Sequence, residues 1–288
     1  MQHVLTPWSL TGVAIALYVV VGCLHVHQVR AELRRRGGSG PAGRTSRLGR
    51  IGTPRDQLVS AALFQAGLLT ALLALVSPVG YWSSQYIWVR AIQDLLLCFA
   101  APMLITAGMP RRADGRLRKP TFRRASPVIA AVSFNLSCLV WHVPALFDAV
   151  PANGAAQLAE HASYLGTGCW FWLQIFRPLP GPWQSPLRRL GLLTATLAAW
   201  TVLGMVLVFG SNVIYPAYAN SLHHAMTVLD DQQTSGGVLW MGMMPFLVTA
   251  GVILLSAWLD EEDSDRPADA EALIRRRAWG WTARSGLR

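Results

Sequence analysis

The first residues that could support chemistry are Arg90, Asp94 and Cys98, which recur at intervals of four within a long apolar stretch. Side chains at i, i+4 and i+8 share one face of an α-helix. A charge at the centre of a membrane helix costs roughly 2.5–3.5 kcal/mol on insertion scales, so it normally faces a partner or a wet cavity. We therefore expect Arg90 and Asp94 either to form a functional polar site or to pair with each other near the membrane interface.

Two histidines are candidate metal ligands. Imidazole is a common metal ligand, and a polar side chain without a function is costly inside a membrane. Cys138 lies four residues before His142, so both side chains could face one site, with Cys98 as a further candidate. Thiolate and imidazole together suit copper(I) or zinc. The second candidate is His161, which follows Glu160. The alternatives are buried cysteines that act as small hydrophobes and histidines that only make interface hydrogen bonds.

The composition predicts the elements that must hold these residues. The chain has 288 residues, 52% hydrophobic and 14% charged, whereas soluble domains carry about 25% charged residues. We predict an all-α membrane protein, a bundle of seven transmembrane helices over residues 8–29, 58–76, 87–108, 127–143, 154–176, 190–209 and 236–259. Residues 1–260 would form this transmembrane domain, and residues 261–288 a cytoplasmic tail that closes with a basic interfacial helix.

The basic residues predict the orientation of the bundle. Apart from Arg90, every lysine and arginine lies in the loops after the first, third and fifth predicted helices or in the tail. Basic loops stay in the cytoplasm, so the N-terminus would lie outside and the C-terminus in the cytoplasm of a multi-pass bacterial inner (plasma) membrane protein. The net charge of +10 is thereby explained by topology, with the lipid bilayer and not nucleic acid as the partner.

This orientation gathers the polar residues of several helices in the outer half of the membrane. The predicted cluster consists of Arg90, Gln93, Asp94, His142, Glu160, His161, Asp231 and Gln232. We expect His142 and His161 to converge near the outer leaflet, with Asp94 and Asp231 close by.

Four segments, in order, resemble the CtaG-type cytochrome c oxidase assembly factors, a polytopic membrane family of bacteria. They are QDLLLCFAAPMLITAGMP, WHVPALFD, AEHASYLGTGCWFW and DQQTSGGVLWMG. The resemblance implies a role in assembling haem–copper oxidases at the copper-insertion stage, with cytochrome c oxidase subunits as partners. The residues that match the family motifs directly are His142, Glu160, His161, Asp231 and Gln232.

The chain departs from the family pattern at three positions. The family usually has histidine at the position of Asp94, and often at those of Arg90 and Gln157. An Arg90–Asp94 ion pair would fill the place of those imidazoles.

We interpret the chain as an accessory membrane protein for cytochrome c oxidase assembly that handles copper at the outer face, with copper as the candidate cofactor of this interpretation. It contains no nucleophile elbow, phosphate loop or HExxH pair, so we predict that it is not an enzyme. The alternatives are a metal-free scaffold or interaction protein of the respiratory chain, and a haem carrier with His142 and His161 as axial ligands. A transporter of ions or small solutes that uses Arg90 and Asp94 is a further alternative.

Overall fold

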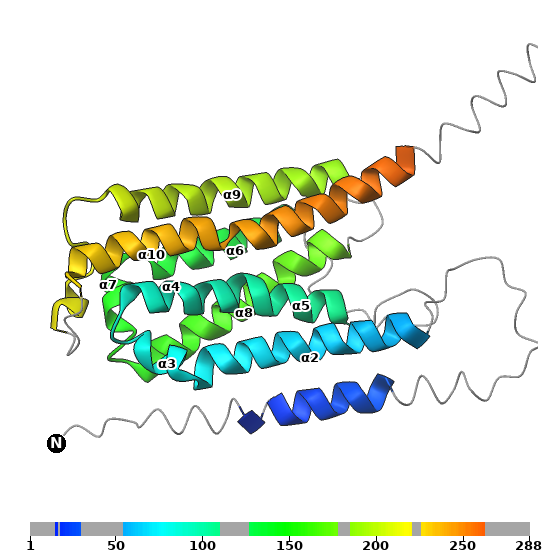
Figure 1. Ribbon diagram of the computed structural model, residues 1–288, viewed down its shortest axis with the longest axis horizontal. Helices are drawn as coiled ribbons and strands as arrows, with labels where there is room; N and C mark the ends of the chain where they lie inside the picture. Colours follow the sequence, from blue (N-terminus) through cyan, green and yellow to red (C-terminus); the bar gives the residue numbers. More distant parts are fainter. Residues whose placement is uncertain are drawn as a thin grey trace, which may run out of the picture.

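The computed structural model describes residues 15–16, 18–29, 54–109, 127–177, 185–220 and 226–262, and this part of the chain consists of helices and their connections without strands. Figure 1 shows the helices packed side by side along one direction. The basic tail predicted to form an interfacial helix and the first residues of the predicted helix 8–29 lie outside the described residues.

The described helices differ widely in length, from 5 residues in α3 to 24 in α9. They are an N-terminal helix Tyr18–Val29, α2 (Pro54–Val76), α3 (Pro78–Trp82), α4 (Ile87–Leu95), α5 (Ala101–Gly108), α6 (Pro127–Trp141), α7 (Pro144–Ala149), α8 (Gly154–Phe176), α9 (Pro186–Phe209) and α10 (Val228–Gly242). After a turn at Met243, residues 244–262 continue α10 as a further helix. A π-helical turn, Leu96–Ala100, joins α4 to α5, and a 3₁₀ turn, Pro216–Asn220, precedes α10.

Four of the described helices are long and apolar enough to cross a membrane, namely Arg55–Val76, Ile87–Gly108, Pro186–Phe209 and Val228–Glu262. The N-terminal helix and α6 are apolar but shorter. The helix α8, which carries Glu160 and His161, is 23 residues long, as α2 is. Its sequence is too polar for it to belong to these four helices. The protein is therefore an all-helical membrane protein, while the count of seven spans and the orientation of the termini stay predictions.

Some helix starts and ends differ from the predicted ones. The cause in each case is a proline or a polar residue at the point where a helix begins. The helix α9 begins at Pro186, before the expected residue 190, because proline suits the first helical turn. The helix α10 begins at Val228, before the expected residue 236, because the Thr227 side chain accepts a hydrogen bond from the Asp230 backbone N–H. The helix α6 ends at Trp141, one turn before Pro144, which opens α7.

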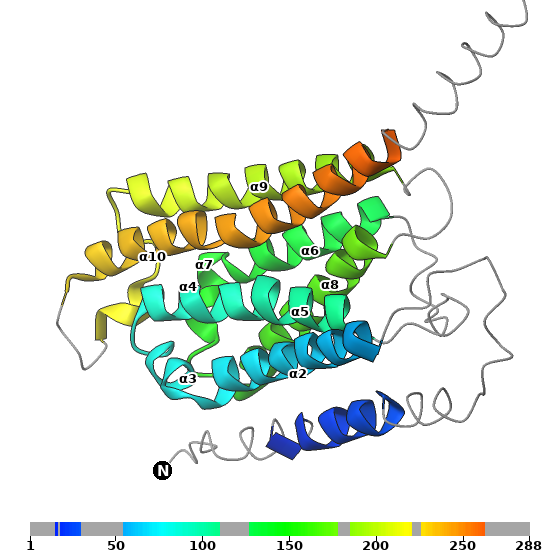
Figure 2. The ribbon, with the colours of Figure 1, turned by 45° about the vertical axis from the view of Figure 1, so that its right-hand side comes forward.

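The helices pack in neighbouring pairs that bring distant parts of the sequence together. The pairs are α2 with α5, α9 with α10, α4 with α10, α6 with α8, and α5 with α8, and Figure 2 shows α4 and α5 between α2 and α10.

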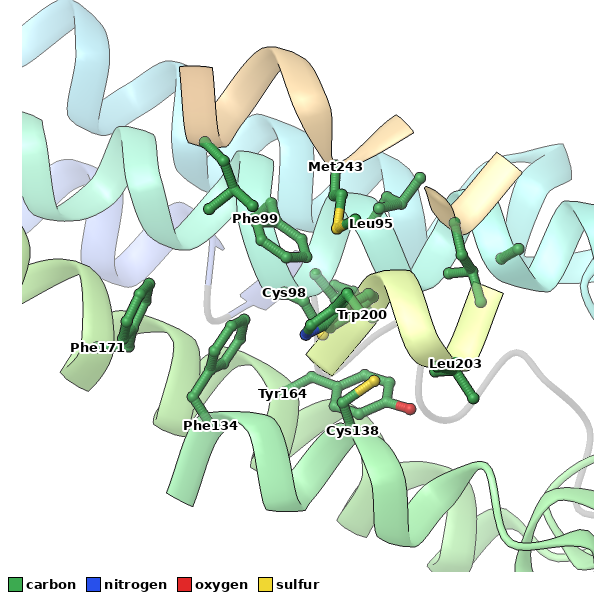
Figure 3. Close-up of a cluster of buried hydrophobic side chains, with 14 of the residues drawn as sticks. Leu95, Cys98, Phe99, Phe134, Cys138, Tyr164, Phe171, Trp200, Leu203 and Met243 are labelled. Carbon is green, nitrogen blue, oxygen red and sulfur yellow. The ribbon is translucent and has the colours of Figure 1, made fainter. Parts of the chain in front are cut away.

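Aromatic side chains fill the centre (Figure 3), where the Phe99 ring lies 4.7 Å from that of Trp200 and 5.5 Å from that of Phe134, centroid to centroid. The π-helical turn thus carries Phe99 and Cys98 into the core.

Candidate functional site

The helix that carries Arg90 and Asp94 begins at a cap supplied by another part of the chain. The backbone N–H groups of Ile87 and Trp88 each donate a 2.8 Å hydrogen bond to the Asp231 carboxylate. The first N–H groups of a helix have no partner inside the helix, and the preceding residue Tyr86 makes no side-chain cap. Asp231 in α10 therefore fixes where α4 begins and which way its polar face points.

Arg90 is buried and reaches away from its own helix. One guanidinium nitrogen, Nη2, lies 2.5 Å from the Glu160 carboxylate of α8. The other, Nη1, donates to the Phe147 carbonyl oxygen at 2.8 Å and to the Tyr218 hydroxyl at 3.2 Å. The guanidinium carbon also lies 3.7 Å from the centroid of the Phe147 ring. Arg90 thus ties together α8, α7 and the 3₁₀ turn before α10.

The expected Arg90–Asp94 ion pair is wrong, because Arg90 pairs with Glu160 instead. The two residues share a face of α4, yet the guanidinium leaves that face for a carboxylate on a neighbouring helix. Asp94 is left 1% exposed, and neither of its carboxylate oxygens has a hydrogen-bond partner among the described residues.

His142 is the polar side chain that lies opposite Asp94. Its Nε2 atom is 3.7 Å from Asp94 Oδ2, and its Nδ1 atom is 2.9 Å from the Cys138 carbonyl oxygen. A carbonyl oxygen only accepts hydrogen bonds, so Nδ1 carries the proton and, in the neutral ring, Nε2 presents its lone pair to Asp94. The Cys138 sulfur lies on the Nδ1 side at 3.7 Å, away from the Nε2 lone pair.

His161 lies beside Glu160, with Nε2 3.9 Å from Oε2 of that carboxylate. It lines a different pocket from His142. Asp94 and His142 line one pocket with Ser235 and apolar side chains, whereas His161 lines a second with Arg90, Glu160 and Gln157. Among the described residues, no group of three or more His, Cys, Asp or Glu side chains is arranged around a common point where a metal ion could bind.

The two glutamines of the predicted cluster hold backbone segments in place. The Gln93 side-chain amide donates to the Ala74 carbonyl oxygen at 2.8 Å, which joins α4 to the end of α2. The Gln232 carbonyl oxygen accepts from the Ile214 N–H at 2.7 Å, and its amide donates to Asn212 at 3.2 Å. These contacts order the connection between α9 and α10.

Sequence reasoning missed two aromatic residues of the site, Phe147 and Tyr218. Besides accepting from Arg90, the Tyr218 hydroxyl donates to the Ser83 carbonyl oxygen at 3.2 Å. Burial raises the pKa of Tyr218 to about 12, although the neighbouring Arg90 charge opposes the rise. The only sequence signal was that Phe147 belongs to the segment WHVPALFD. Tyr218 lies in a connection whose fold the sequence does not indicate.

One of three comparisons with known proteins found a match. The family model of the cytochrome c oxidase caa3 assembly factors matches residues 42–261. Neither the comparison with curated proteins nor that with solved structures gives a match. The matched range covers α2 to α10 and includes every residue of the site.

Proposed function

The chain belongs to the cytochrome c oxidase caa3 assembly factor family, and on this basis we propose that it is a non-catalytic accessory protein that associates with cytochrome c oxidase subunits while the oxidase is assembled. The observation that carries the proposal is the family match over residues 42–261, which spans most of the chain. A membrane location fits the role, because four of the described helices are long and apolar enough to cross a bilayer.

The buried polar network supports a role for one end of the bundle. Arg90, Tyr218 and Ser83 link the connection after α3 to the 3₁₀ turn before α10, and Arg90 also holds α7 through the Phe147 carbonyl. Figure 1 shows these connections at the same end of the molecule. An end braced in this way can present a fixed surface to a partner subunit.

We propose that this braced end faces outward in a bacterial plasma membrane. The basic loops predicted to be cytoplasmic leave helices at the opposite end, after α5 and α8. Contact with oxidase subunits would then occur within the membrane and at its outer surface.

The test is deletion of the gene in its own host, followed by complementation. We expect membranes from the deletion strain to contain the oxidase subunits but much less assembled enzyme, measured as haem absorbance and as oxygen consumption with reduced cytochrome c. The wild-type gene restores both signals. The purified chain itself should not oxidise cytochrome c.

A second terminal oxidase of the same membranes, one that accepts electrons from quinol, serves as the control for general respiratory damage. Normal cytochrome c oxidase content and activity in the deletion strain would overturn the proposal. An equal loss of both oxidases would also overturn it, because the defect would then not be specific to one assembly pathway.

A further inference from the structure

Two hydrogen-bond acceptors face each other inside the bundle, at Asp94 and His142. The Nδ1–H group of His142 donates to the Cys138 carbonyl oxygen at 2.9 Å, so Nε2 of the neutral ring offers a lone pair. The atom it faces, Asp94 Oδ2, lies 3.7 Å away. If Asp94 is ionised, both atoms are acceptors and no donor lies between them. A buried charge without a partner is costly, so the source of the missing donor decides the state of this pair.

None of the described side chains around Asp94 supplies that donor. Arg90, one turn earlier on the same helix, directs its terminal nitrogens to other residues. The Ser235 hydroxyl donates to the Gln232 carbonyl oxygen at 2.7 Å. The Tyr164 hydroxyl is buried without a partner, and both carboxylate oxygens of Asp94 are too, so these two groups do not reach each other.

A water molecule does not fit between Asp94 and His142. Their pocket is otherwise lined by Ser235 and by apolar side chains of α4, α7, α9 and α10, and it is too small for a water molecule. The charge of Asp94 also lacks a counterion, because Arg90 is paired with Glu160. The further ionisable side chains of the described part of the chain that act on Asp94 are neutral in their ordinary forms at pH 7. They are Cys98, Cys138, Tyr164, Tyr215 and Tyr218.

We propose that Asp94 is a carboxylic acid in the folded protein and donates a hydrogen bond to Nε2 of His142, so that the two residues form a buried proton-binding site. One proton gives both acceptors a partner and removes the charge of Asp94. A neutral pair also avoids the cost of two buried charges, which a carboxylate beside an imidazolium would carry. The two atoms have to approach by about 1 Å to reach hydrogen-bond distance.

The surroundings hold both partners of this site in position. The contact of Nδ1 with the Cys138 carbonyl oxygen fixes the tautomer of His142 and turns Nε2 towards Asp94. The backbone of His142 is held as well, because the Tyr215 hydroxyl donates to its carbonyl oxygen at 3.0 Å. On the other side, Asp94 belongs to α4, whose start is fixed by the Asp231 cap. The shared proton therefore joins α4 to the end of α6.

The site requires that the chain takes up a proton when it folds. In the unfolded chain an aspartate has its ordinary pKa of about 3.9 and is ionised at neutral pH. The folded chain then binds one proton more than the unfolded chain, so its stability falls as the pH rises. One proton corresponds to a change of about ten-fold in the folding equilibrium constant per pH unit. This consequence does not rest on the proposed role in oxidase assembly, because it is measured on the purified chain.

The first measurement is the infrared spectrum of the full chain in detergent at neutral pH. A carboxylic acid has a C=O stretching band that a carboxylate lacks, and this band shifts when the proton is exchanged for deuterium. We expect Asp94→Asn to remove one such band from the wild-type spectrum. The asparagine amide can donate to Nε2 in place of the acid, so this variant should fold. Asp230→Asn is the matched control, because Asp230 is exposed, and it should leave the acid band unchanged.

A second variant and a second measurement identify the acceptor and count the proton. His142→Phe keeps a planar ring but removes the nitrogen acceptor, so it should move the acid band of Asp94 to the higher frequency of an acid without a hydrogen bond. Chemical unfolding between about pH 5 and 7 compares the wild type with Asp94→Asn. The folding equilibrium constant of the wild type should fall about ten-fold more per pH unit than that of the variant.

Three results would overturn the proposal. An unchanged acid band in Asp94→Asn, or an equal pH dependence of unfolding, would mean that Asp94 is ionised in the folded protein. A band that disappears in Asp94→Asn but is unaffected by His142→Phe would mean that the acid bonds elsewhere. Should His142→Phe not fold, nitrogen NMR of the histidine rings in the wild type decides the point. A ring protonated at both nitrogens that is absent from Asp94→Asn would show an ion pair in place of the neutral pair.

Discussion

Arg90 and Glu160 form an ion pair between α4 and α8, 2.5 Å apart and with side chains 3% and 2% exposed. The two residues are 70 positions apart in the sequence. A buried pair of this kind contributes little compared with a well-packed apolar pair, but removal of one partner leaves an uncompensated charge. Replacing one charge alone should therefore destabilise the protein strongly, and replacing the second charge as well should add less than it does on its own.

We predict that Arg90→Met and Glu160→Gln each lower the free energy of unfolding by about 3–5 kcal/mol. The double variant should lose clearly less than the sum of the single losses, because neither charge is then left alone. Chemical unfolding in detergent, followed by circular dichroism, measures all three changes. Additive losses would mean that the two charges do not depend on each other.

The apolar runs of the sequence predicted where several helices lie. The predicted ranges 87–108 and 154–176 have the same ends as Ile87–Gly108 and α8, because Pro110 follows the first run closely and Asn153 caps the second. Starts were missed where a helix opens with polar residues, as at Asp230 and Asp231 in α10. A search for apolar stretches does not detect such a start.

The sequence identified most residues of the site but not their partners. Spacing of four showed that Arg90 and Asp94 share a face of one helix. It did not show how that helix is rotated against α8, which decides that Arg90 meets Glu160. The cap by Asp231 joins residues 144 positions apart, and such a contact depends on tertiary packing that no local pattern encodes.

The cap on α4 leads to a second prediction. Asp231→Ala removes the acceptor for two backbone N–H groups, those of Ile87 and Trp88, and should lower the free energy of unfolding by about 1–3 kcal/mol. Asp231→Asn keeps one side-chain oxygen and should lose less. Thermal unfolding in detergent and amide hydrogen exchange at Ile87 and Trp88 measure the effect.

The adjacent residue provides the matched control for this cap. Asp230 is exposed, and its bonds to other described residues stay within its own turn, to Thr227, so Asp230→Ala should cost about 1 kcal/mol or less. It should leave exchange at Ile87 and Trp88 unchanged. If Asp230→Ala were as damaging as Asp231→Ala, the effect would come from the start of α10 and not from α4.

Close contact between α9 and α10 gives a third prediction. A Cβ atom added at Gly236 would lie 2.7 Å from the Gly204 carbonyl oxygen and 2.8 Å from the Val208 backbone nitrogen. Gly236→Ala should therefore push the helices apart and cost about 1–3 kcal/mol. At the neighbouring Gly237 a Cβ meets nothing within 4 Å, so Gly237→Ala should be neutral or stabilise α10 by up to about 1 kcal/mol.

The pair of glycine variants is compared by thermal unfolding in the same detergent. A loss for Gly236→Ala with none for Gly237→Ala would identify the α9–α10 contact as the cause. Equal losses at both positions would contradict the packing seen here, because only Gly236 faces α9 closely.

A fourth prediction concerns alkaline pH and Tyr218, whose pKa is raised to about 12 by burial. Because the folded protein holds this proton more tightly than the unfolded chain, with its ordinary pKa of about 10, the phenol's contribution is complete below about pH 10. It is lost as the pH rises towards 12, a loss of about 2–3 kcal/mol. Tyr218→Phe has no proton to lose, so its stability should fall less over this range.

Chemical unfolding at several pH values between about 9 and 12 compares the wild type with Tyr218→Phe. The control is Tyr81→Phe at a tyrosine that is 57% exposed, which should keep the wild-type dependence on pH. The absolute stability of Tyr218→Phe should be lower at neutral pH, because Arg90 and the Ser83 carbonyl each lose a hydrogen bond. A wild-type pH dependence in Tyr218→Phe would show that the alkaline loss arises at other groups, and that the proton on Tyr218 does not brace this end of the bundle.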